Sequence, residues 1–179
     1  MKLAGQFSTF KQRGEWVELL FMAAAASHGY HILKPWGDSL AYDVAIEHRG
    51  GLLRVQVKST SYRRGTGYYC EFKPFRYQEG YSLKEVDLFA AYVIPTTTWY
   101  LIPAAALLRH HIQGLMLCPV LPPQRCPYLY EKYREAWGLL GKSRCELVRH
   151  AKVHQTPAAS NLGDCPFRAS NVCQPKCKV

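Results

Sequence analysis

The feature that most constrains the fold is a pair of strand-like segments, residues 42–46 and 52–58, on either side of a short turn. Both segments are rich in apolar and β-branched residues, and the residues between them include Gly50 and Gly51. Two such segments around a glycine-containing turn predict a β-hairpin. An isolated hairpin is barely stable in water, so the rest of the chain must supply elements that cover its apolar face.

The predicted register of this hairpin brings polar side chains together. With the turn centred between Arg49 and Gly50, Asp43 is expected to lie opposite Gln56. Side chains alternate along a strand, so Gln56 and Lys58 project from the same face. Directly opposed side chains have Cβ atoms roughly 5 Å apart. The pattern therefore predicts that an acid, an amide and a lysine meet at one end of the hairpin.

Further elements are expected before and after the hairpin. Residue spacing predicts helices over 13–28, 103–111 and 128–140, and strands over 30–33, 68–72, 87–94 and 98–102. This order predicts an α/β fold with a central mixed β-sheet flanked by helices. Residues 142–179 have no sustained period and are expected to form a basic, cysteine-containing, flexible C-terminal tail.

Composition excludes several classes of protein. The chain has 179 residues, of which 48% are hydrophobic and 20% charged, which excludes wholesale disorder. The apolar run 19–26 is too short to span a bilayer, and no apolar segment follows the first residues as in a signal peptide. The seven cysteines are an odd number, so free thiols and a cytoplasmic protein are expected. The net charge is +10, and residues 101–179 hold eleven basic and four acidic residues, which favours a polyanionic partner.

The polar end of the hairpin suits phosphodiester hydrolysis. A carboxylate such as Asp43 and a neutral oxygen such as that of Gln56 can hold Mg²⁺, and Glu18 on the preceding helix can add a further ligand. A nearby lysine, Lys58, can orient a water molecule or stabilise negative charge on the reacting phosphate.

Each of these residues also has an ordinary structural explanation. An acid at the start of a strand is usually solvated, a Gln-x-Lys pair is usually the polar face of a strand, and a helical glutamate usually lies on the surface. Asp38 is a competing acid, but its Gly-Asp-Ser context favours a turn. The joint spacing favours a functional site, because the polar residues interrupt an otherwise apolar hairpin on one face at one end.

Several blocks of the chain resemble the PD-(D/E)XK nuclease superfamily. They are Gly14-x-x-x-Glu18, the segment 35–44 that leads to Asp43, and the segment 55–60 that contains Gln56 and Lys58. Within the superfamily the chain is most similar to group I intron-associated (homing-type) endonucleases, which are related in their core to archaeal Holliday-junction resolvases. The segments 85–92, 98–103 and 130–137 share this similarity. The resemblance covers about residues 9–140.

This resemblance implies a restriction-endonuclease-like core within a nuclease domain at residues 1–141, followed by the tail. It implies a homing-type or structure-selective DNA endonuclease that depends on Mg²⁺, with Mn²⁺ as a substitute. Glu18, Asp43 and Gln56 correspond to metal ligands, and Lys58 to the catalytic lysine. Gln56 stands where the superfamily usually has an acid. The alternative is therefore a catalytically weak or inactive DNA-binding module on the same fold.

Two further expectations concern DNA. Arg63 and Arg64 follow the catalytic strand within a glycine-containing loop, where they can contact phosphates beside the scissile bond. A chain with a single site cuts one strand at a time, so double-strand cleavage implies a homodimer or a higher homo-oligomer.

Overall fold

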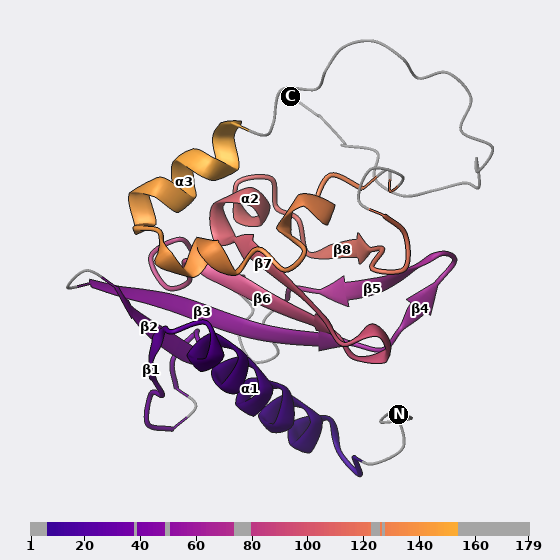
Figure 1. Ribbon diagram of the computed structural model, residues 1–179, viewed down its shortest axis with the longest axis horizontal. Helices are drawn as coiled ribbons and strands as arrows, with labels where there is room; N and C mark the ends of the chain where they lie inside the picture. Colours follow the sequence, from indigo (N-terminus) through magenta and orange to yellow (C-terminus); the bar gives the residue numbers. More distant parts are fainter. Residues whose placement is uncertain are drawn as a thin grey trace.

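A five-stranded mixed sheet forms the centre of the protein, with strand order β1-β2-β3-β6-β7 (Figure 1). In this computed structural model the described residues are 7–37, 39–48, 51–73, 80–122, 126 and 128–153. The strands are β1 (His31–Leu33), β2 (Val44–His48), β3 (Gly51–Thr60), β6 (Leu88–Val93) and β7 (Thr98–Pro103). All neighbouring strands are antiparallel except β3 and β6, which are parallel.

The β2–β3 hairpin has the register that the sequence predicts. Val44 lies opposite Val55, and Ile46 lies opposite Leu53. The pairing extends one residue beyond β2, because the Asp43 amide donates a hydrogen bond to the Val55 carbonyl at 3.0 Å. β3 continues past the hairpin for several residues along β6, so its far half lies in the interior of the sheet.

Helix α1 (Phe10–Ser27) covers one face of this sheet (Figure 1). The Thr9 side chain caps its first turn by accepting a hydrogen bond from the Gln12 amide at 3.1 Å. The helix ends before Gly29, whose φ of 81° suits a residue without a side chain. Its buried residues are Val17, Phe21 and Ala25. The hairpin residues Val55 and Val57 share the face of the sheet that α1 covers, because Tyr92, which pairs with Ser59 on that face, contacts Trp16 of α1.

A small second sheet lies on the opposite side of the central sheet (Figure 1). It consists of β4 (Arg63–Arg64), β5 (Gly67–Glu71) and β8 (Gly114–Leu117). The rings of Phe72, which follows β5, and Phe89 on β6 pack edge to face with centroids 5.3 Å apart. The predicted strand 68–72 therefore exists as β5, but it belongs to this second sheet. Helix α2 (Ala104–Leu108) follows β7 and is shorter than the predicted helix 103–111.

The predicted helix over 128–140 is wrong. This segment forms two short 3-10 helices, η3 (Glu131–Tyr133) and η4 (Trp137–Gly141), separated at Glu135 by a left-handed φ of 50°. Its acidic side chains are bound to the rest of the domain: Glu131 accepts hydrogen bonds from the Tyr100 hydroxyl and the Cys118 amide, and Glu135 accepts one from the Trp99 amide. These tertiary bonds replace the regular helix that the residue spacing favours.

The expectation of a flexible tail over 142–179 is wrong for its first part. Helix α3 (Arg144–Val153) is ordered and buries Leu147 and Ala151. The Arg144 guanidinium donates a hydrogen bond to Asp87 at 2.7 Å and ties α3 to the start of β6. Helix α3 therefore belongs to the folded domain, which extends beyond the predicted boundary at residue 141. Residues 154–179 lie outside the described residues.

Two expectations from composition can be compared with the described part of the chain. Cys70, Cys118, Cys126 and Cys145 are free thiols, in agreement with the prediction for these four cysteines. Among the described helices, none is long and apolar enough to cross a membrane.

Candidate active site

Asp43 and Gln56 meet at the end of the β2–β3 hairpin, as the register predicts. The Gln56 amide nitrogen donates a hydrogen bond to Asp43 Oδ2 at 2.5 Å, and the Val57 backbone amide donates to the same oxygen at 2.8 Å. Within the described residues, no hydrogen bond is made to Asp43 Oδ1. Gln56 is 8% exposed. The protein thus fixes one oxygen of this carboxylate and leaves the other for a ligand.

The Asp43 carboxyl is held in an unfavourable electrostatic environment. Its pKa is raised from 3.8 to about 6, chiefly because burial disfavours the charged form and secondly because Glu18 repels it. The Val57 amide, Lys58 and Lys34 oppose this shift and lower the pKa of Asp43. A cation placed between the two carboxylates would remove the repulsion, so the site gains from binding a metal ion.

Glu18 reaches this cluster from α1, on the element that the sequence predicts for it. Its carboxylate forms an ion pair with the Lys34 ammonium. Lys34 follows β1, and the pairing of Leu33 with Ala45 carries the chain at Lys34 toward the start of β2. The role of Lys34 was not predicted. The signal that could have found it is its position directly after a short strand that can pair with the hairpin.

Lys58 lies on the same face of β3 as Gln56, and the structure surrounds it with two unpredicted partners. Its ammonium donates a hydrogen bond to the Lys73 carbonyl at 3.2 Å and lies 5.1 Å from the centre of the Tyr81 ring. Burial lowers the pKa of Lys58, while the negative charge of Asp43 opposes the shift. The partner carbonyl and ring restrict the ammonium to a small region next to the acids.

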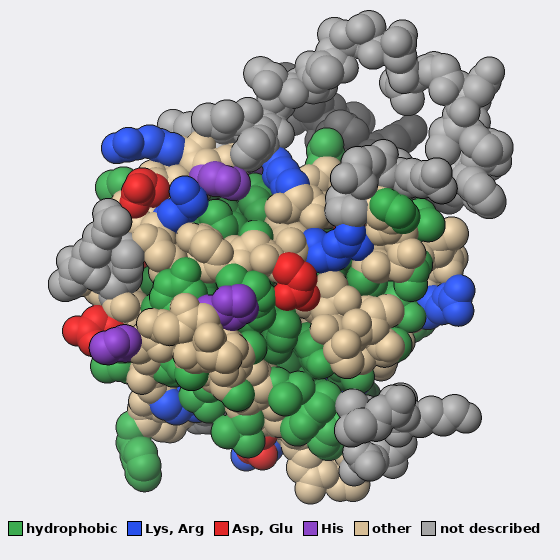
Figure 2. Space-filling model, viewed as in Figure 1, with side chains coloured by type: hydrophobic (Ala, Val, Ile, Leu, Met, Phe, Trp, Pro, Cys, Tyr) green, Lys and Arg blue, Asp and Glu red, His purple; other side chains and the backbone are tan. Residues whose placement is uncertain are grey.

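Arg63 and Arg64 lie outside this cluster. They form β4, pair with Tyr68 and Gly67 of β5, and are exposed. In the space-filling view, basic side chains are scattered over the face shown, and one projects over β4 (Figure 2). The β4–β5 hairpin follows β3 directly. The Thr60 hydroxyl, at the end of β3, fixes this second hairpin by donating a hydrogen bond to the Tyr69 carbonyl at 2.6 Å. Asp38, the competing acid, lies outside the described residues.

The donor set at the hairpin suits a hard divalent cation. Glu18 and Asp43 offer carboxylate oxygens, and Gln56 offers an amide oxygen, all of which Mg²⁺ accepts. No group of three or more His, Cys, Asp and Glu side chains that could hold a metal occurs in the described part of the chain, so a neutral ligand is needed to complete the set. Gln56 directs its amide nitrogen at Asp43, and its oxygen would face the same point after half a turn of the amide.

The comparisons with known proteins identify the family of the chain. Residues 8–118 match the family model described as PD-(D/E)XK endonuclease. The chain belongs to the PD-(D/E)XK endonuclease family. This membership confirms the predicted family and the predicted function class of DNA endonuclease, whose members generally use divalent metals.

A solved structure extends the agreement to the fold. The bacterial homing endonuclease I-Ssp6803I is similar to this PD-(D/E)XK endonuclease with 27% sequence identity and a TM-score of 0.65. The similarity covers 75% of this chain and 94% of that one. It confirms the predicted α/β restriction-endonuclease-like fold. No curated protein matches the chain significantly in sequence.

Proposed function

We propose that this PD-(D/E)XK endonuclease is a Mg²⁺-dependent, homing-type DNA endonuclease whose site consists of Glu18, Asp43, Gln56 and Lys58. The observation that carries the proposal is the hydrogen-bonded pair of Asp43 and Gln56, with the pKa of Asp43 raised by burial and by Glu18 and with Lys58 on the same face of β3. A partly buried carboxylate with a raised pKa, next to a second carboxylate and a partly buried lysine, is typical of a metal-assisted hydrolase.

The acids and the amide would hold the cation. When bound, Mg²⁺ polarises the phosphoryl group and lowers the pKa of a bound water molecule. Asp43 is fixed for this task by the Val57 amide, which keeps one oxygen in place and leaves the other to face the ligand. Glu18 would exchange its ion pair with Lys34 for the metal. Mn²⁺, which accepts the same oxygen ligands, would substitute for Mg²⁺.

Lys58 would act on the reacting phosphate and the attacking water. Its three N–H donors exceed what the Lys73 carbonyl can accept, so the ammonium retains donors for a water molecule or a phosphate oxygen. In a water-poor site such donors stabilise the charge that develops in the transition state. Because burial lowers the pKa of Lys58, proton exchange with the attacking water costs less than it would for a solvated lysine.

Gln56 keeps a second candidate function open. A neutral amide removes one negative charge from the ligand set, and in the structure Asp43 is already bonded to the amide nitrogen while Glu18 is paired with Lys34. This internally satisfied arrangement favours weak metal binding. The second candidate is a DNA-binding module on the same fold that does not cleave.

Nicking of supercoiled plasmid separates the two candidates. We expect wild-type protein to nick DNA in Mg²⁺ or Mn²⁺ but not in EDTA, while DNA binding persists in EDTA. Lys58→Ala should lower cleavage by at least about 10²-fold with little effect on binding, as for loss of a charge-stabilising group. Lys84→Ala, which removes an exposed lysine outside the cluster, is the matched control and should cleave like wild type.

Two results would contradict the nuclease mechanism. Metal-independent binding with no cleavage by wild-type protein would support the binding module instead. Cleavage by Lys58→Ala at the rate of Lys84→Ala would remove the lysine from the mechanism. Double-strand cuts in the same assay are expected only from a homodimer or higher homo-oligomer, because each chain holds one site; sedimentation of the protein with and without DNA tests this.

A further inference from the structure

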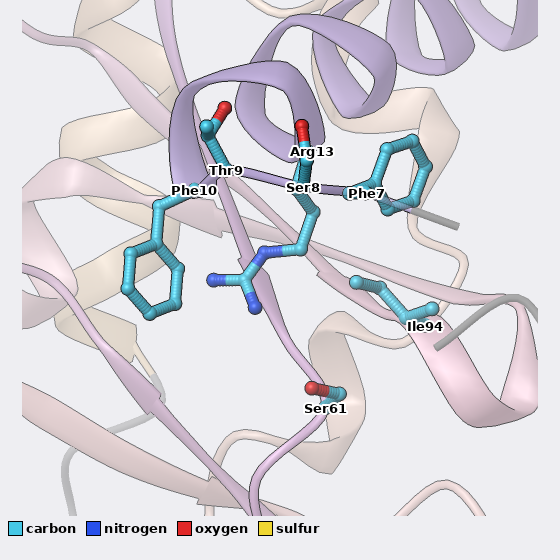
Figure 3. Close-up of a pocket in the computed structure, with 7 residues that line it drawn as sticks. All are labelled: Phe7, Ser8, Thr9, Phe10, Arg13, Ser61 and Ile94. Carbon is cyan, nitrogen blue, oxygen red and sulfur yellow. The ribbon is translucent and has the colours of Figure 1, made fainter. Parts of the chain in front are cut away.

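A cavity of about 270 Å³ lies apart from the carboxylate cluster, where three separate parts of the chain meet (Figure 3). One wall comes from the residues that lead into α1 and from its first turn, another from the residue that follows β3, and the third from the residue that follows β6. The lining residues are Phe7, Ser8, Thr9, Phe10, Arg13, Ser61 and Ile94. The space is below the usual range for a drug-sized ligand or cofactor, roughly 300–1,000 Å³, and suits a smaller group.

An arginine with no counter-ion among the described residues extends into the middle of this cavity. Figure 3 shows the Arg13 guanidinium extending between Phe10, Ser61 and Ile94. Its Nε is buried and has no hydrogen-bond partner, and its central carbon lies 5.1 Å from the centre of the Phe10 ring. In the described part of the chain Arg13 forms no ion pair, whereas Arg54 and Arg144 are paired with Asp87. A partly desolvated cation without a partner is costly, and a bound anion would remove that cost.

The cavity is close to the candidate active site. Ser61 is the third residue after Lys58, and a strand rises about 3.3 Å per residue, so the two positions are roughly 10 Å apart along the chain. Arg13 and Lys58 also act on the same buried thiol, since both positive charges lower the pKa of Cys70 against the larger effect of burial. Phosphates of one DNA strand are spaced about 3.4 Å along the helix axis. Lys58 faces away from α1, whereas Ser61 lines a cavity beside the first turn of α1. A DNA strand held at Lys58 would therefore have to pass the end of β3 for a phosphate two or three nucleotides away to reach the cavity.

We propose that this cavity binds one backbone phosphate of the DNA substrate, two or three nucleotides from the scissile bond. Arg13 donates hydrogen bonds to the phosphate oxygens, the Ser61 hydroxyl donates another, and the exposed Phe10 ring packs against the adjacent deoxyribose. Arginine and serine are common donors to DNA phosphates, and such contacts fix the register of the duplex without reading its sequence. The inference rests on the proposed function, because it assumes that DNA is cleaved beside Lys58.

The test is DNA binding over a salt series. A fluorescein-labelled 25-base-pair duplex of random sequence is titrated with protein in EDTA at several NaCl concentrations, and anisotropy gives the affinity. Arg13→Gln should reduce the slope of log affinity against log salt by about 0.9, the value for one phosphate contact. It should also weaken binding about tenfold at the lowest salt, as for loss of a charged hydrogen bond. Lys11→Gln is the matched control, because Lys11 lies on the same helix and its side chain is 81% exposed.

A second variant keeps the test valid if Arg13→Gln fails to fold, which thermal melting by circular dichroism detects. Ser61→Asp places a negative charge at the exposed edge of the cavity and should weaken binding by at least as much as Arg13→Gln. The phosphate site would be overturned if Arg13→Gln and Ser61→Asp showed the same affinity and salt slope as Lys11→Gln. If the wild-type protein still cleaved DNA, the nuclease function would remain intact. Wild-type protein that neither binds the duplex nor nicks plasmid would instead overturn the proposed function, and the phosphate site with it.

Discussion

Two aspartates, the partly buried Asp43 and the buried Asp87, lie on neighbouring parts of the central sheet in opposite electrostatic environments. Asp87 is 8% exposed and accepts hydrogen bonds from the Arg54 guanidinium at 2.9 and 3.0 Å and from Arg144 at 2.7 Å. Asp43 has no arginine partner among the described residues, and Glu18 repels it. The protein pairs the first charge directly with arginines, whereas Lys58 and Lys34 only partly offset the burial and repulsion of the second. Under the proposed function, this difference is what a bound cation would use.

The largest effect that separates the two aspartates is on cleavage. Asp43→Asn should lower Mg²⁺-supported nicking by at least about 10³-fold, because the site loses a carboxylate ligand and with it several kcal/mol of metal-derived stabilisation. The binding affinity for the labelled duplex in EDTA should stay close to that of wild type. Strong cleavage by Asp43→Asn, with unchanged metal affinity in isothermal titration, would locate the metal elsewhere.

The reverse effect is expected at Asp87. Asp87→Asn leaves the largely buried Arg54 without its counter-ion and should lower the free energy of unfolding by about 3 kcal/mol, measured by urea denaturation. Glu15→Gln is a matched control, because it breaks an exposed pair with Lys11 at 3.9 Å, and it should cost less than about 1 kcal/mol. Equal decreases in the free energy of unfolding for Asp87→Asn and Glu15→Gln would show that the arginine pairs of Asp87 do not stabilise the fold.

Stability as a function of pH gives a third contrast. The pKa of Asp43 rises from 3.8 to about 6 on folding, so the folded state binds the proton more tightly than the unfolded chain. Its contribution to stability is therefore full below pH 4 and is lost as the pH rises through 6. In EDTA, Asp43→Asn should remove this loss. Its free energy of unfolding, measured by urea denaturation, should exceed that of wild type by about 2 kcal/mol at pH 7.5 and differ little from it at pH 4. A higher free energy of unfolding for wild type than for Asp43→Asn at pH 7.5 would mean that neighbouring groups stabilise the ionised Asp43 carboxylate.

The smallest expected effect is at Gln56. Gln56→Glu adds a negative charge to the ligand set and should tighten Mg²⁺ binding by about tenfold, measured by titration of nicking rate against metal concentration. In EDTA the same variant should be less stable than wild type, because a third carboxylate joins Glu18 and Asp43. Tighter metal binding without that loss of stability would indicate that position 56 does not face Asp43 in solution.

The sequence predicted the hairpin and its polar end because both depend on local rules. Alternation along a strand and the position of a glycine-containing turn are sufficient to place Asp43 beside Gln56. The same rules do not predict the position of Lys34, which follows the separate strand β1 and forms an ion pair with Glu18. They also do not predict the cavity around Arg13, which is closed by Ser61 and by a residue that follows β6.

The two incorrect predictions have a common cause. The segment 128–140 has helical spacing, but Glu131 and Glu135 bond to Cys118, Tyr100 and Trp99, which are distant in sequence. The segment after residue 142 has weak periodicity, but α3 is held by a contact from Arg144 to Asp87, 57 residues earlier. Tertiary hydrogen bonds of this kind override local propensity, and the sequence alone does not display them.

The alternation along β3 has a consequence for how such a protein can diverge. Gln56 and Lys58 face the candidate site, whereas the alternating residues Val55 and Val57 face α1, so neighbouring positions are under different structural constraints. A lineage can exchange an acid for an amide at position 56, and so change its demand for metal, without disturbing the valines that hold the sheet to its helix. Chemistry at this site can therefore drift while the architecture is inherited unchanged.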